Sequence, residues 1–175
     1  NLRYAYFEQL RQDIGAAAIC VAHHREDSVE TVLINLLRGT GLHGLCGIRP
    51  VNGHIVRPLL GVGRRDIESF LASLHQPFVT DSTNLEADVV RNKIRLQVMP
   101  LLRDINPSAD LSIWRTTERM AEAAKVFDRS LDEDLKAVVE TVGDMICVRV
   151  DQLRQLPSAE YVLFRLLGDY GFRPQ

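Results

Sequence analysis

Apolar and polar positions alternate along the first hundred residues in a pattern that predicts short strands followed by amphipathic helices. Residues 16–21 form an apolar run of strand length, and 54–60 form a second one. Helical periodicity follows each run, at 26–38 and at 64–75. In the first of these helices, apolar residues fall at i, i+3, i+4, i+7 and i+8, the spacing of one buried face: Val29, Val32, Leu33, Leu36 and Leu37. In the second helix, the residues expected to face inward are Ile67, Phe70, Leu71 and Leu74. This order is typical of an α/β protein with a parallel sheet.

A helical pattern returns at 87–104, where Pro100 is expected to kink or split the helix. The polar turn Asn106-Pro107-Ser108 then marks the best domain boundary. Beyond it the pattern predicts a long helix over 109–139, a short strand over 145–150 and a last helix over 158–170. The sequence therefore predicts an α/β domain over 1–106 and a mainly α-helical domain over 107–175.

Composition narrows the class of protein. The 175 residues carry a formal net charge of -2, so nucleic acid could be bound only by local basic patches. The three cysteines are scattered without metal-ligand spacing, which favours reduced thiols in a cytoplasm. No apolar run approaches the ~20 residues that a membrane-spanning helix needs. We expect a cytoplasmic enzyme or binding module without a membrane partner.

The residues that directly follow the first strand are the strongest candidates for chemistry. His23 and His24 lie where open α/β sheets bind their ligands, at the carboxyl end of a strand. Asp27 and Glu30 follow at the start of the helix, near the positive end of its dipole. A metal site is one alternative, with Asp27 or Glu30 as the Mg²⁺ ligand. The other is a helix N-terminus with acidic residues and two surface histidines.

Three basic segments are candidates for anion binding. Arg38-Gly39-Thr40-Gly41 has the composition of a phosphate-binding loop, although a glycine-rich helix C-cap explains it equally well. Arg91 and Arg95 form an i, i+4 pair around Asn92, and like charges so placed usually meet an outside anion; a solvated helix face is the alternative. Arg57, Arg64 and Arg65 form a lesser cluster, for which a surface role is expected and a backbone-contacting role is the alternative.

These segments, in this order, resemble the bacterial tRNA(Ile)-lysidine synthetase family. The resemblance covers about residues 1–107, with the helical remainder similar on fewer residues. The matching stretches are Ala22-His23-His24-x-x-Asp27-x-x-Glu30-Thr31, Leu37-Arg38-Gly39-Thr40-Gly41-Leu42-x-Gly44-Leu45, Ile55-Val56-Arg57-Pro58-Leu59-Leu60, Asp81-Ser82-Thr83-Asn84, Arg91-Asn92-x-Ile94-Arg95, Met99-Pro100-Leu101-Leu102 and Asn106-Pro107.

The resemblance implies the C-terminal half of a parallel-sheet ATP-pyrophosphatase domain over 1–106, followed by a helical linker domain that contacts tRNA. It also implies a ligase that uses ATP and Mg²⁺. Such an enzyme adenylates C2 of the wobble cytidine in a tRNA(Ile) with a CAU anticodon, and free lysine then displaces AMP. The catalytic residues implied are His23, Asp27, Glu30 and Arg95. Those implied to bind substrate, ATP or tRNA are His24, Arg38, Gly39, Thr40, Gly41, Arg91 and Asn92.

One departure from the family pattern matters. The phosphate loop Ser-Gly-Gly-x-Asp-Ser occurs nowhere in the 175 residues. We expect it upstream of Asn1, in a longer protein, so this chain alone should not adenylate a substrate. A tRNA thiolase of the same superfamily and a non-catalytic tRNA-binding module remain alternatives. A homodimer is also expected, because a truncated sheet exposes an edge strand that can pair with a second copy.

Overall fold

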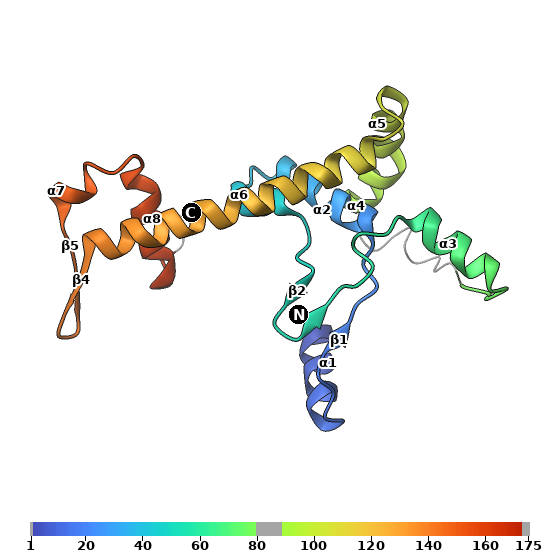
Figure 1. The fold of residues 1–175 in the computed structure, drawn as a ribbon, viewed down its shortest axis with the longest axis horizontal. Helices are drawn as coiled ribbons and strands as arrows, with labels where there is room; N and C mark the ends of the chain where they lie inside the picture. Colours follow the sequence, from blue (N-terminus) through green and yellow to red (C-terminus); the bar gives the residue numbers. More distant parts are fainter. Residues whose placement is uncertain (1, 80–88, 173–175) are drawn as a thin grey trace. The chain divides into compact units, whose positions relative to one another are not determined.

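The computed structural model describes residues 2–79 and 89–172, so the motif Asp81–Asn84 lies outside the described residues. The chain divides into two compact units, residues 1–121 and 122–175 (Figure 1). Helix α6 (Ala109–Val138) runs from the first unit into the second. The domain boundary expected at 106–107 stays a prediction, since the division at 121–122 reflects only which residues pack together. Each unit is therefore described separately.

The first unit begins with helix α1 (Leu2–Asp13) and a small sheet. The chain turns at Gly15, whose φ of 65° favours glycine, and enters β1 (Ile19–Cys20). β1 pairs in parallel with β3 (Ile55–Val56), which pairs antiparallel with β2 (Val51–Asn52). The sheet is thus mixed, with one parallel pair of two residues per strand. The larger parallel sheet expected from the sequence stays a prediction.

Helix α2 (Arg25–Leu37) forms the centre of the first unit, and its buried face is rotated from the predicted one. Val29 and Val32 are buried as predicted, but Leu36 and Leu37 are 57% and 74% exposed. Ser28 is buried instead, and its Oγ is satisfied there by accepting a hydrogen bond from the backbone N–H of Ile48 at 3.0 Å. The loop after α2, with the short helix η1 (Leu42–Cys46), therefore packs along this side of the helix.

The helix expected over 87–104 is divided into three segments. They are α4 (Val89–Lys93), the π-helix η3 (Ile94–Val98) and α5 (Met99–Ile105). Pro100 lies in the first turn of α5, where the missing N–H is tolerated. The wider π turn before it absorbs the break that the sequence predicts. Ile94 and Met99 face the core with Val29 and Ile34 of α2, while Val90, Val98 and Leu101 are exposed.

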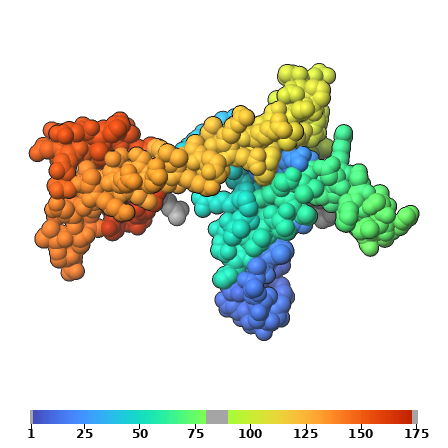
Figure 2. Space-filling view, viewed as in Figure 1, coloured from blue at the N-terminus to red at the C-terminus, as the bar shows by residue number. Residues whose placement is uncertain are grey.

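Helix α3 (Arg64–Ser73) is less buried than its pattern predicts. Phe70 and Leu74, expected to face inward, are 62% and 60% exposed. The green atoms of α3 form a projection in the space-filling view (Figure 2). Amphipathic periodicity shows which face is apolar, but a second surface has to cover that face before it is buried.

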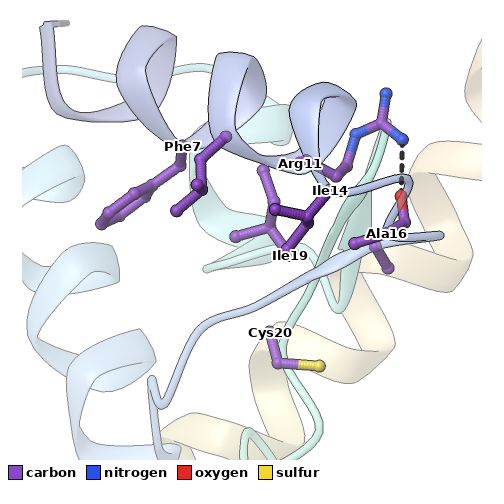
Figure 3. Close-up of a pocket in the computed structure, with 8 residues that line it drawn as sticks. Phe7, Arg11, Ile14, Ala16, Ile19 and Cys20 are labelled. Atoms are coloured by element: carbon purple, nitrogen blue, oxygen red, sulfur yellow. Dashed lines mark hydrogen bonds between the residues drawn. The ribbon is translucent and has the colours of Figure 1, made fainter.

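A small apolar cavity of about 240 Å³ separates α1 from β1. Phe7, Ile14 and Ile19 approach one another there, and Cys20 lies on the strand (Figure 3). The guanidinium of Arg11 closes one end by donating a hydrogen bond to the carbonyl of Ala16 at 2.8 Å.

The second unit combines the end of α6 with a hairpin and two short helices. The hairpin consists of β4 (Val139–Val142) and β5 (Met145–Val148), and the helices are α7 (Val150–Leu153) and α8 (Ala159–Asp169). Leu131, Val138, Leu153 and Val162 form its core. A separate, mainly helical domain stays a prediction. In the part of the chain that the structure describes, no helix combines the length and the apolar character needed to cross a bilayer.

Replacing Ile94 with Ala should lower the free energy of unfolding by about 2–5 kcal/mol, because Ile94 is 2% exposed and its truncation leaves a cavity. Leu96→Ala is the matched control, since Leu96 is two residues away and 58% exposed. Urea unfolding measures both. Equal losses in the two variants would contradict the packing of η3 described here.

Candidate functional site

The N-terminus of α2 positions the first group of candidate residues. His24 is the N-cap, and its backbone N–H donates to Asp27 Oδ2 at 3.0 Å. Asp27 thereby satisfies one of the donors left open at a helix start, and its negative charge lies near the positive end of the helix dipole. His24 and Asp27 are thus fixed by the same turn of backbone.

A partly buried ion pair joins α2 to η3. The Glu30 side chain is 3% exposed, and its two oxygens accept from Arg95 Nε at 2.7 Å and Nη2 at 2.8 Å. This two-point geometry is the strongest that Arg and a carboxylate form. Hydrogen bonding to Glu30 raises the pKa of Arg95 above its ordinary value. Both residues are candidates from the sequence, and the structure brings them into contact.

The other arginine of the pair also faces the acidic residues of α2. Arg91 Nη2 donates to Thr31 Oγ1 at 3.3 Å, and its Nη1 lies 4.0 Å from Asp27 Oδ1. Arg95 Nη2 lies 3.6 Å from the same oxygen. Binding of an outside anion by Arg91 and Arg95 stays a prediction. Their like charges are offset by Asp27 and Glu30 of the same chain.

Glu26 belongs to this group, although the sequence analysis did not single it out. Its Oε2 lies 3.0 Å from His24 Nδ1 and accepts from the backbone N–H of Arg64, also at 3.0 Å. Burial alone would raise the pKa of Glu26, but hydrogen bonds from His24 and from backbone N–H groups outweigh it and lower the pKa to about 2. The contact with Glu26 in turn raises the pKa of His24. An acidic residue two positions after the N-cap is the only sequence signal that could have indicated this pair.

His23 has different surroundings from His24. Arg57 Nε donates to His23 Nδ1 at 3.1 Å, and burial, with the charges of Arg57 and Arg91, lowers the pKa of His23 despite the opposing charge of Asp27. The pKa values of these two adjacent histidines are thus shifted in opposite directions. The surface role expected for Arg57 is wrong, because this guanidinium contacts a candidate site residue.

A cavity of about 640 Å³ opens beside the charge cluster. Its wall includes His24, Glu26, Glu30 and Arg95, together with the start of α3. Arg103 and Asp110, which form a two-point ion pair at 2.7 and 2.8 Å, lie on the wall as well. Carboxylates and guanidinium groups thus share one lining, which suits a polar ligand that carries both signs of charge.

The loop 38–41 lies at the opposite end of α2 from His24 and Asp27. The backbone N–H groups of Arg38, Gly39 and Thr40 donate to carbonyls of the last helical turn, and Gly39 has a φ of 74°. Of the two interpretations left open by the sequence, this geometry is that of a helix C-cap. Phosphate binding by Arg38, Gly39, Thr40 and Gly41 stays a prediction.

The remaining candidates are Asn92, as a binding residue, and Asp27, as a Mg²⁺ ligand. Asn92 lies in α4 between the two arginines, and its Nδ2 is buried without a hydrogen-bond partner among residues 2–79 and 89–172. Within the same residues, no cluster of three or more His, Cys, Asp or Glu side chains could hold a metal ion. Asp27 is bonded by a backbone N–H and faces two arginines, so its surroundings do not fit Mg²⁺ held by protein groups alone.

The polar cluster follows a parallel strand, the position at which α/β proteins bind their ligands. Residues 1–102 match the PP-loop domain family, and the chain belongs to that family. Its relatives include the tRNA(Ile)-lysidine synthases of Bacteroides thetaiotaomicron, 46% identical over 172 residues, and Parabacteroides distasonis, 47% identical over 172 residues. Each match covers 98% of this chain and 39% of the relative. The synthase of Caldanaerobacter subterraneus is 39% identical over 162 residues, which cover 90% of this chain and 34% of the relative.

The family resemblance drawn from the motifs is therefore confirmed. The chain spans about two fifths of the length of the curated relatives it matches. The roles of single residues stay predictions, since overall sequence identity does not assign a role to any one residue.

Arg95→Met should destabilise the protein by about 3 kcal/mol, because it leaves Glu30 buried without a partner. The double variant Glu30→Leu, Arg95→Met should recover most of this loss, since no buried charge remains. Arg103→Met is the matched control: the Arg103 side chain is 42% exposed, so breaking its pair should cost about 1 kcal/mol or less. Urea unfolding that shows the same cost for Arg95→Met and Arg103→Met would contradict this account.

The contribution of Glu26 to stability should depend on pH. The lowered pKa of Glu26 makes its contribution fully present above the ordinary value of 4.5 and lost as pH falls towards 2. The raised pKa of His24 makes its part fully present below 6.5 and lost as pH rises through the value in the folded protein. The difference in unfolding free energy between the parent and Glu26→Gln should therefore be largest between pH 4.5 and 6.5.

The matched control is Glu68→Gln, which removes the exposed ion pair with Arg64. Its effect should be nearly constant from about pH 5 to 8, because arginine keeps its proton throughout this range. If the Glu26→Gln difference is equally flat, the His24–Glu26 contact does not stabilise the fold.

Proposed function

We propose that the protein containing this chain joins lysine to C2 of the wobble cytidine in a tRNA(Ile) with a CAU anticodon. ATP is consumed to AMP and diphosphate. The observation that carries the proposal is the assembly of the family's two motif segments, 23–31 and 91–95, into one charge cluster beside a cavity. The likeness to proteins named tRNA(Ile)-lysidine synthase, at 46–47% identity, supports the same substrates.

The reaction takes place in two balanced steps. The C2 oxygen of the cytidine attacks the α-phosphorus of ATP, and diphosphate leaves. The ε-amine of lysine then attacks C2 and gives up a proton to water, and AMP leaves with the former C2 oxygen. Both steps need positive charge near phosphate oxygens, and the second needs an uncharged amine.

Asp27 is the residue best suited to bind the lysine ε-ammonium. Both oxygens of Glu30 are occupied by Arg95, whereas Asp27 Oδ1 lies at longer distances, 3.6 and 4.0 Å, from two guanidinium groups. An ammonium placed against Asp27 would also lie near Arg91 and Arg95. These positive charges favour the neutral amine, which is the form that attacks.

Arg91 and Arg95 contribute differently to phosphate binding in this proposal. Nε and Nη2 of Arg95 are held by Glu30, so Arg95 acts mainly through its charge and by fixing Glu30. Arg91 makes the longer contacts, at 3.3 and 4.0 Å, and an incoming phosphate can compete for them. ATP also requires a phosphate loop, which these 175 residues do not contain. Mg²⁺ enters the proposal with ATP, without a protein ligand assigned to it.

Lysine transfer should be measured with the full-length protein, ATP, labelled lysine and a CAU-anticodon tRNA(Ile). Asp27→Asn should lower kcat/KM for lysine by about 100-fold or more, since it removes the charge that binds the ammonium. Asp13→Asn, at the exposed end of α1, is the matched control and should leave transfer unchanged.

Arg91→Gln should weaken tRNA or ATP binding and reduce the salt dependence of tRNA binding.

Three outcomes would contradict the proposed function. If full-length protein with an intact phosphate loop adenylates tRNA yet transfers no lysine, it is another PP-loop tRNA-modifying enzyme. It could bind tRNA without any ATP–diphosphate exchange, which would indicate a binding module. Finally, Asp27→Asn could leave the KM for lysine unchanged, which would remove Asp27 from the lysine site.

A further inference from the structure

His23 and Arg57 are brought together by the parallel pairing of β1 and β3. Cys20 lies opposite Val56 in this pair, and the backbone N–H of Val21 donates to the carbonyl of Val56 at 2.9 Å. Arg57 directly follows β3, and His23 comes three residues after β1. Both side chains therefore start from the carboxyl end of the same strand pair. Residues 34 positions apart meet there through Arg57 Nε and His23 Nδ1, 3.1 Å apart.

The chemistry of this contact fixes the position of a proton. A guanidinium group has only donors and does not lose its proton in proteins. His23 Nδ1 must therefore be the acceptor and carry a lone pair. An imidazole with a lone pair on Nδ1 carries its hydrogen on Nε2.

We propose that Arg57 is a positioning residue that keeps His23 neutral with its hydrogen on Nε2, so that His23 acts as a hydrogen-bond donor and not as a base. The inference rests on the proposed function for the reaction that His23 serves. In this state Nδ1 is occupied and Nε2 already bears a hydrogen, so neither nitrogen can take a proton from lysine. His23 can instead donate from Nε2 to a substrate oxygen on which negative charge develops.

The position of Arg57 is itself fixed by two contacts with the loop before β2. Its Nη1 donates to the carbonyl of Arg49 at 2.7 Å, and its backbone N–H donates to the carbonyl of Pro50 at 2.9 Å. A donor held at two further points presents Nε to His23 in one orientation. This arrangement resembles the outer partners that orient metal-bound histidines in other proteins.

Burial and the charges around His23 favour the neutral imidazole, as does the hydrogen bond from Arg57. Burial lowers its pKa most, and the positive charges of Arg57, Arg91 and Arg3 lower it further. Asp27 is the group that raises it. These groups come from α1, α2, α4 and the segment after β3, and their net effect favours neutral His23 at neutral pH.

The test is to observe the proton on His23 directly. Full-length protein labelled with ¹⁵N in its histidines is examined by NMR without substrates, and the His23 signals are assigned with His23→Gln. We expect an acceptor-type Nδ1, a protonated Nε2 and a pKa below 6.5. In Arg57→Met the two neutral tautomers should mix and the pKa should rise. Arg119→Met is the matched control and should leave both unchanged.

Activity provides an independent measurement, and the two His23 variants test the proposal even if the Arg57 variant does not fold. His23→Gln keeps an N–H donor and should retain lysine transfer within about tenfold, whereas His23→Ala should lose about 100-fold or more. Arg57→Met should lower kcat by at least about tenfold, because a histidine in the wrong tautomer is a poor catalyst.

Hydrogen on Nδ1 of His23 in the parent protein would overturn the proposal, as would an unchanged tautomer and pKa in Arg57→Met. Equal losses in His23→Gln and His23→Ala would also overturn it, because they indicate a base. The NMR result does not depend on lysine transfer. An absence of transfer in the parent protein would therefore count against the proposed function and leave the positioning by Arg57 to be decided by the spectrum.

Discussion

The first unit depends on the ion pair between Glu30 and Arg95. Glu30 lies on the buried face of α2, where a carboxylate is tolerated only if its charge is matched and both oxygens are bonded. Arg95 supplies both bonds from η3, 65 residues later in the chain. This requirement fixes the pairing of α2 with η3 more strictly than apolar contact does, because apolar side chains can slide and repack while a two-point ion pair cannot. Val29, Ile34, Ile94 and Met99 pack together in the register that the pair allows.

The same pair also shapes the candidate site. With Glu30 engaged, the remaining negative charge near the two arginines belongs to Asp27, and Asp27 is held by the first turn of α2. The charged groups are therefore oriented before any ligand arrives, which reduces the reorganisation that binding requires. The opposite pKa shifts of His23 and His24 have different causes. Burial, followed by the charges of Arg57 and Arg91, lowers the pKa of His23, whereas hydrogen bonding to Glu26 raises the pKa of His24.

The sequence predicted local features well and long-range ones poorly. Periodicity located α2 to within one residue at each end, together with the burial of Val29 and Val32. It could not predict that Glu30 would be buried, since that depends on a partner on a distant helix. The motifs identified His23, Asp27, Glu30 and Arg95 as candidates, but the contacts with Glu26 and Arg57 depend on the start of α3 and the end of β3. The exposed Phe70 and Leu74 show the converse, an apolar face that the described residues do not cover.

The π turn of η3 has a consequence for how this segment tolerates changes in length. A π turn contains one residue more than an α turn, so it amounts to an insertion held inside a helix. A deletion in a regular α-helix rotates everything after it by about 100°. Deleting one residue of 94–98 would instead remove the extra residue and restore regular α-helix, so the residues after it would keep nearly the same direction. This segment should therefore accept the loss of one residue while Met99 stays in the core, although the interior of a helix usually rejects such a change.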